Sequence, residues 1–264
     1  MTGHSLPAPR SLSRVERLAW HAGFLAALGG AWEAAARQTE TLLLPTATGT
    51  LAAAAGLMMS REFWQALWIS NQALVVGFPL AAAAGVLLGL ALGRSRTLAR
   101  WLEIHLQILL VVPKTAIIPL IVMASGFGLR SRAIVIFAFA LPIIAVTVQA
   151  GVQTVDARLI AMARAFSATE RQIWWRVLLP AALPGVMTGL RLGLARAITG
   201  MVAVELTLIA VGLGRLLLQF RGDFDAASLY ATVLIVMAEA VVVMRLATAL
   251  EQRVGSFDPG AMPQ

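Results

Sequence analysis

The chain contains no cysteine, and charged side chains are scarce for its length. Without cysteine among its 264 residues, disulfides, zinc–thiolate sites and iron–sulfur clusters are excluded. Charged residues make up only 13% of the chain and apolar residues 59%, whereas soluble domains are about half apolar and about a quarter charged. This apolar surface is too large for a core of this size to bury, so it must face lipid. The composition predicts an integral membrane protein.

Lysine is nearly absent as well. Lys114 is the only lysine, so arginine supplies almost all of the positive charge behind the net charge of +8. The arginines lie in short gaps between apolar runs rather than on one basic face, which argues against nucleic acid as a partner. A loop that binds ATP ends in Gly-Lys-Ser/Thr, so it needs a lysine that follows glycine. The only lysine of this chain, Lys114, follows Pro113 in an apolar run, so the sequence has no such loop.

Other catalytic and metal-binding patterns are missing too. The three histidines do not cluster, and neither a His-Glu-x-x-His helix nor a Gly-x-Ser-x-Gly elbow is present. We therefore expect no catalytic residue, no cofactor and no metal in this chain, which is predicted not to be an enzyme. An intramembrane enzyme would need such a constellation. A secondary transporter driven by an ion gradient, the main alternative, often shows internal repeats, and none is apparent.

Six apolar runs have the length of about 20 residues that a helix needs to cross a bilayer. Their approximate bounds are 18–36, 66–92, 102–126, 133–152, 182–203 and 227–250. We expect an all-α polytopic membrane protein with about six transmembrane helices. Its parts are a cytoplasmic segment 1–17, a transmembrane domain 18–253 and a tail 254–264. The stretch 42–59 could be a seventh span, but Pro45 and the threonines after it favour an extended entry and a short helix at the outer surface.

The distribution of arginine predicts that both termini are cytoplasmic. With the N-terminus inside, eleven arginines fall in inner segments and six in outer segments. Arginine and lysine are enriched in cytoplasmic loops, so this bias favours the orientation. It places the segment 156–180 on the cytoplasmic side.

Small residues recur every four positions in the second predicted span. They are Gly77, Ala81, Gly85, Gly89 and Gly93. This spacing puts them on one helix face, where a second backbone can approach closely. The partner is either another helix of the same subunit or a second subunit.

The segment 156–180 is much longer than a connection between two helices requires. Up to its terminal proline it is rich in alanine, leucine and arginine and has no glycine, which predicts an amphipathic basic helix. Such a helix lies either on anionic lipid or in a groove of a soluble partner. The residues alone leave both possibilities open.

The same segment resembles the cytoplasmic EAA loop of ABC importer permeases. That pattern has Glu-Ala-Ala, then a Gly six residues after the Glu, and an Ile-x-Leu-Pro ending. Ala163 matches the third position, but Ala161 replaces the Glu, Met162 the first Ala and Ser167 the Gly. The ending is present as Val177, Leu178, Leu179 and Pro180.

The resemblance covers roughly residues 44–253. Pro113 and Pro119 resemble the family's third span, Arg191 and Glu205 lie in a match to its fifth span, and the run 212–214 fits its outer segment. The most similar subfamily comprises the permeases of nitrate, sulfonate and taurine importers. That subfamily also carries uncharged heterocycles, so the resemblance leaves the substrate open.

The resemblance implies a bacterial inner-membrane transport subunit that works with partners in a lipid bilayer. A second permease, expected to form a homodimer, completes the path. Two copies of a cytoplasmic ATPase hold ATP and Mg, and an extracytoplasmic binding protein delivers a small solute. A short helix of the loop docks in a cleft of the ATPase and transmits the closure of the ATPases.

The resemblance also assigns residues to this coupling contact. They are Leu159, Ala161, Met162, Ala163, Arg164, Phe166, Ser167 and Ala168, with Val177, Leu179 and Pro180 at the end of the loop. Without the Glu, docking should depend on the apolar Leu159, Ala163 and Phe166 and on Arg164, with Phe166 as the anchor. Serine resists the positive φ that glycine allows. We therefore expect Ser167 to stay in an ordinary region or the helix to continue through Ala168.

Ionisable residues inside membranes are costly and suggest functional sites. Pro113, Lys114, Arg191 and Glu205 are the candidates for the translocation path. Pro113 weakens the helix beside Lys114 and predicts a kink in the third span. Lys114 either lines the path, reaches to the lipid headgroups or pairs with a carboxylate. Arg191 and Glu205 are fourteen residues apart and share a helix face. Glu239 has no assigned role beyond a buried pair.

Overall fold

The computed structural model describes residues 13–39, 43–207 and 210–254, which form helices joined by short turns and contain no strand. This confirms the all-α prediction. The helices are α1 (Arg14–Thr39), α2 (Ala47–Met59), α3 (Arg61–Arg94), α4 (Arg96–Val111), α5 (Lys114–Ser125), α6 (Leu129–Gln153), α7 (Ala157–Ala165), α8 (Glu170–Ile173), the π-helical turn η1 (Trp174–Leu178), α9 (Leu179–Thr207), α10 (Gly212–Gly222) and α11 (Ala226–Val254). Residues 1–12 and 255–264, which make up most of the two predicted terminal segments, lie outside the described residues.

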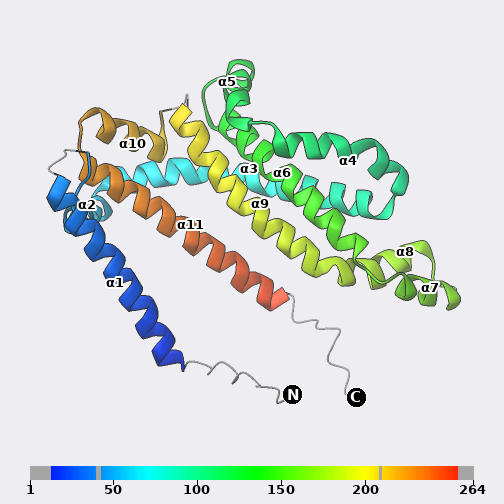
Figure 1. The fold of residues 1–264 in the computed structure, drawn as a ribbon. Coiled ribbons are helices and arrows are strands. Elements are labelled where there is room, and N and C mark those ends of the chain that lie inside the picture. The colour runs from blue at the N-terminus through cyan, green and yellow to red at the C-terminus, as the bar shows by residue number, and fades with distance from the viewer. Residues whose placement is uncertain (1–12, 40–42, 208–209, 255–264) are drawn as a thin grey trace, which may run out of the picture.

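Three long helices, α3, α6 and α9, form the centre of the molecule (Figure 1). Their buried side chains form one cluster that includes Ala81, Ile136, Ile144 and Met201. The small-residue face of α3 packs on α6 within the same subunit. A Cβ on Gly89 would lie 2.6 Å from the carbonyl oxygen of Ala145, so the two backbones touch there. Gly77, Gly85 and Gly93 meet α6 in the same way.

Helices α6 and α9 also cross backbone to backbone. The crossing lies at Gly151 and Gly185, where a Cβ built on Gly151 would be 2.7 Å from the Cα of Gly185. Any larger side chain would force the helices apart, so this contact fixes the position where α9 begins its path through the core.

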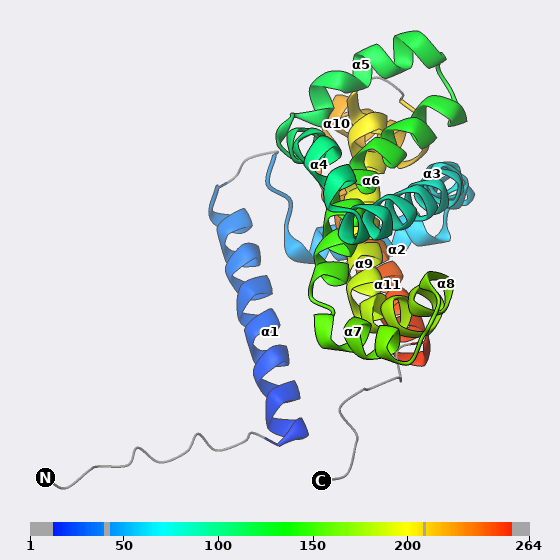
Figure 2. The ribbon, with the colours of Figure 1, turned by 90° about the vertical axis from the view of Figure 1, so that its right-hand side faces the viewer.

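Four described helices are long and apolar enough to cross a membrane, and α4 with α5 forms a bent pair that could make a fifth span. The four are Arg61–Arg94, Leu129–Gln153, Glu170–Thr207 and Ala226–Ala249. The first predicted span, 18–36, is helical within α1, but α1 is not among these helices. It projects away from the central helices (Figure 2) and leaves Trp20, Phe24 and Leu28 exposed.

The predicted span 102–126 is divided into two separate helices at Pro113, a larger break than the kink expected there. Helices α4 and α5 meet at an angle of 99°. Pro113 lacks an N–H, and the residue before a proline is driven out of the helical region. Val112 accordingly has φ −57° and ψ 130°. Within residues 43–59, the expected extended entry and short helix are present, because Thr46 is extended, caps α2 and accepts a hydrogen bond from Gly49 N.

Candidate functional site

Helices α7 and α8 form a compact unit at one end of the molecule, opposite α5 and α10 (Figure 1). Helix α7 starts at Asp156, whose side chain accepts a hydrogen bond from Arg158 N at 2.8 Å. This N–H lowers the pKa of the Asp156 carboxyl, because it stabilises the carboxylate. None of the nine residues of α7 is buried. The helix therefore presents most of its surface to a partner or to solvent.

The apolar residues assigned to the coupling contact line this exposed surface. Phe166 is 82% exposed, Met162 55% and Leu159 40%. Ala161, Arg164 and Ser167 are exposed as well, while Ala163 and Ala168 are half-buried. An aromatic side chain this exposed at the tip of a short helix is a suitable anchor for a partner's pocket.

The turn after α7 differs from the sequence prediction. Ser167 has φ +56°, in the left-handed region. Its N–H donates to the carbonyl of Arg164 at 2.9 Å, and the N–H of Ala168 donates to the carbonyl of Ala163 at 3.0 Å. These two bonds define a Schellman ending. The expectation that serine would avoid positive φ was wrong, because both hydrogen bonds require the left-handed conformation at this position.

Glu170 joins the α7–α8 unit to the end of α3. Its carboxylate receives hydrogen bonds from Arg94 at 2.8 Å and from Arg164 at 2.9 Å. Beneath the unit, Ile160 and Trp174 pack against a small buried cluster at the entrance to α9. The α7–α8 unit is therefore in contact with both the end of α3 and the start of α9.

The predicted end of the loop coincides with a π-helical turn. Leu179 N bonds to the carbonyl of Trp174, which closes a wider turn than that of an α-helix. Pro180 has no N–H, and its ring would clash with the carbonyl four residues before it in an α-helix. The π turn makes the helix wider just before this proline, which leaves room for its ring. Val177 and Leu179 are half-buried there and Pro180 is exposed.

A buried carboxylate holds α10 at the opposite end of the molecule. Glu205 is 1% exposed. Its carboxylate accepts hydrogen bonds from Ser70 Oγ at 2.8 Å and from Gly214 N at 3.1 Å. Ser70 Oγ in turn accepts a bond from Leu213 N at 2.9 Å. The first turn of α10 is thereby tied to α3 and α9.

Arg132 is the charged partner of Glu205, and the sequence analysis missed it. Its Nη1 lies 3.3 Å from Glu205 Oε1 and donates to the carbonyl of Ile69 at 2.8 Å. In the sequence, Arg132 is one of the six arginines of the predicted outer segments and carries no further signal. The two residues are 73 positions apart, so no spacing pattern connects them.

Lys114 lies at the break between α4 and α5 and lines a cavity of about 200 Å³. The cavity is also lined by Thr115, Phe139, Ile143 and Arg196. The Lys114 ammonium lies 5.8 Å from the centre of the Phe139 ring, within the range of a cation–π contact. The structure thus brings Lys114 together with Arg196, a residue that the path prediction omitted. Arg191 and Glu205 do not line this cavity, and Pro113 caps α5 beside it.

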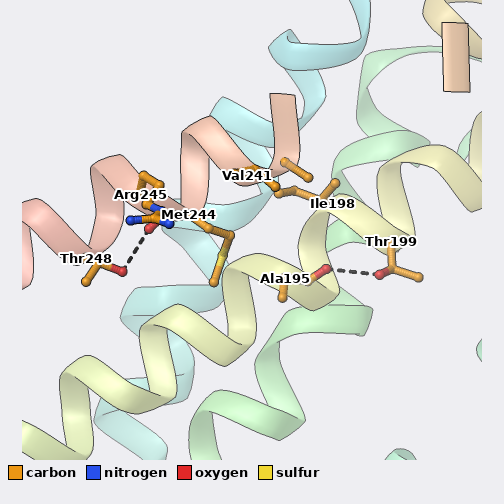
Figure 3. Close-up of a pocket in the computed structure, with 8 residues that line it drawn as sticks. Ala195, Ile198, Thr199, Val241, Met244, Arg245 and Thr248 are labelled. Carbon is orange, nitrogen blue, oxygen red and sulfur yellow. Dashed lines mark hydrogen bonds between the residues drawn. The ribbon is translucent and has the colours of Figure 1, made fainter. Parts of the chain in front are cut away.

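A second hollow is an open groove of about 390 Å³ between α9 and α11 (Figure 3). Ile198, Val241 and Met244 make its walls mainly apolar, and Arg245 is its one charged residue. Glu239, also on α11, accepts a hydrogen bond from Asn71 Nδ2 at 2.6 Å. Within the described residues, no group of three or more histidine, cysteine or acidic side chains could hold a metal ion.

The comparison with protein families agrees with this architecture of membrane helices and an exposed α7–α8 unit. The profile of the family "Binding-protein-dependent transport system inner membrane component" matches residues 81–256. The chain belongs to this family, which makes it the permease subunit of an ABC importer in the inner membrane.

Two bacterial permeases illustrate the relationship. The taurine transport system permease protein TauC of Escherichia coli is 31% identical over 195 residues, which covers 74% of this chain and 70% of that protein. The putative aliphatic sulfonates transport permease protein SsuC of Bacillus subtilis is 31% identical over 193 residues, with 73% and 70% covered. An inward-facing structure of the MetNI methionine ABC transporter aligns with a TM-score of 0.57 and 24% identity, over 76% of this chain and 95% of that chain. This last likeness shows the fold.

Proposed function

We propose that a cytoplasmic ATPase docks on the α7–α8 unit and drives import through this permease. What supports the proposal is the exposed apolar tip of the unit, with Phe166 82% exposed, on a base held by Glu170. Phe166 lies past the end of α7, at a fixed turn, which suits insertion into a pocket.

The importer is proposed to contain two copies of this permease, two ATPases and one extracytoplasmic binding protein. ATP and Mg belong to the ATPases in this scheme, and both termini of the permease are cytoplasmic. The relatives named for taurine and aliphatic sulfonates support a small solute with an acidic oxyanion group as substrate. The binding protein selects that solute and the permease passes it on.

Assembly tests this proposal directly. The permease is co-expressed with the ATPase and binding protein of its own transport system and purified through a tag on the permease. Mass measurement of the purified complex should give two permeases and two ATPases. A stable permease that transports solute without any ATPase would overturn the proposal.

A further inference from the structure

We propose that the cavity at the α4–α5 break binds the oxyanion group of the transported solute, with Lys114 and Arg196 as its cationic ligands. The inference rests on the proposed function, because it assigns the substrate class that passes through the permease. Four helices contribute to the cavity: the end of α4, the start of α5, the middle of α6 and the middle of α9. A water molecule takes up about 30 Å³ of liquid, so a cavity of about 200 Å³ has room for a small oxyanion and some water.

The charge in this cavity is unbalanced. Neither Lys114 nor Arg196 forms an ion pair with another described residue. Lys114 is half-buried and Arg196 is exposed on the surface of this single subunit. Both are carried by apolar helices, where an uncompensated charge in a membrane is costly. Two like charges that share one cavity also repel each other. An anion between them removes both penalties, and this is the physical reason to expect one.

The carboxylates on the neighbouring helices α4 and α9 are already hydrogen-bonded to other residues. Glu205 is on the same helix as Arg196, but it is already bonded to Arg132, Ser70 and Gly214 N. Glu103, on α4, receives hydrogen bonds from glutamine side chains. No carboxylate lines the cavity. The counter-ion must therefore come from outside the described chain.

The rest of the lining suits an organic oxyanion such as a sulfonate. Thr115 offers a hydroxyl group, and α5 begins at Lys114 with Pro113 as an N-cap that has no side-chain hydrogen bond. The positive end of this helix dipole adds to the two cations. Phe139 and Ile143 provide an apolar wall on the other side for a short carbon chain. A cationic or uncharged solute would leave the two charges unpaired.

The single lysine of the chain makes the site directly measurable. The complete importer is placed in nanodiscs of phosphatidylcholine and treated with an amine-acylating reagent. The peptide that contains Lys114 is then followed by mass spectrometry. The probes are methanesulfonate, nitrate and the uncharged methanesulfonamide. At a probe concentration of about ten times its Kd, a bound anion should slow acylation by about tenfold. Methanesulfonamide should have no effect.

Variants identify the ligands. Arg196→Gln should abolish protection by methanesulfonate, and Arg196→Lys should restore part of it. Arg100→Gln, which removes an exposed arginine on α4, should leave protection unchanged. The same importer, assayed for ATP-driven uptake, shows whether the proposed function holds. Uptake without anion protection of Lys114 overturns the site alone, while absence of both uptake and ATPase binding overturns the proposed function.

A lipid phosphate is the other source of the same chemistry. Nanodiscs that contain phosphatidylglycerol distinguish it from the solute. Protection of Lys114 by phosphatidylglycerol alone, with no effect of methanesulfonate or nitrate in phosphatidylcholine, would assign the cavity to a lipid headgroup and contradict the proposal.

Discussion

Ser167 shows how a single residue sets the end of the proposed coupling helix. In the left-handed region an L-residue pays about 1 kcal/mol or more, because its Cβ approaches the following carbonyl. The two hydrogen bonds that close α7 compensate for this cost. Phe224 follows the same pattern after α10, with φ +56° and a bond from Asp225 N to the carbonyl of Phe220.

Replacing Ser167 by glycine should therefore strengthen the end of α7. We expect Ser167→Gly to stabilise the turn locally by up to about 1 kcal/mol, since glycine adopts positive φ without strain. Amide hydrogen exchange of α7 in the detergent-solubilised protein measures this. The control is Ala165→Gly, which changes the last residue of α7, two positions before Ser167. This substitution should weaken α7 by about the same amount. Faster exchange in Ser167→Gly would contradict the assignment.

Sequence patterns identified single residues better than they identified pairs. Periodicity marked Gly89 and its ladder, and Pro113 marked the weak point of the third span. The 99° bend itself depends on how α5 packs on α6 and α9, which no local pattern contains. The ion pair of Glu205 with Arg132 and the cavity shared by Lys114 and Arg196 each bring together distant segments, so they appear only once the helices are packed.

Helix α10 depends on one buried ion pair for its position. The side chains of Arg132 and Glu205 are 6% and 1% exposed. Glu205 also accepts hydrogen bonds from Ser70 and Gly214 N, and Arg132 also donates to a backbone carbonyl. Removal of one partner of a buried pair leaves an uncompensated charge, which typically costs about 3 kcal/mol or more. The pair thus connects the entry to α10 with the core helices.

Glu205→Ala should accordingly lower the free energy of unfolding by about 3 kcal/mol. Thermal unfolding in detergent provides the measurement. The matched control is Arg215→Ala, because Arg215 on the same α10 pairs with Glu62 at 2.8 Å but both side chains are largely exposed. That substitution should cost less than about 1 kcal/mol. If Glu205→Ala unfolds at the wild-type temperature, the ion pair does not hold α10.

At the scale of the whole molecule, the ion pair between Arg94 and Glu170 places the α3–α4 junction beside the α7–α8 unit. Both must therefore lie on one side of the membrane. The 29 residues of α9 separate this unit from α10, a length of about 43 Å at 1.5 Å per residue, enough to cross a bilayer.

Reporter fusions should reflect this arrangement. Fusions at Ser95 and Ser167 are expected to report the cytoplasm, and a fusion at Asp223, just after α10, should report the outside. Alkaline phosphatase and green fluorescent protein fusions in intact cells give opposite signals for the two sides. An external signal at Ser167 would remove α7 from the ATPase and contradict the proposed orientation.

The coupling of ATP hydrolysis to transport through α7 is the central claim, and Phe166→Ala tests it most directly. The complete importer is reconstituted in proteoliposomes, and solute uptake and ATP hydrolysis stimulated by the binding protein are measured on the same sample. Loss of the exposed anchor should cost about 2 kcal/mol of docking, so both activities should fall together while the permease inserts normally. Phe224→Ala, at the equivalent turn after α10, should leave ATPase binding unchanged. Wild-type assembly, uptake and hydrolysis in Phe166→Ala would show that α7 and α8 are not the coupling element.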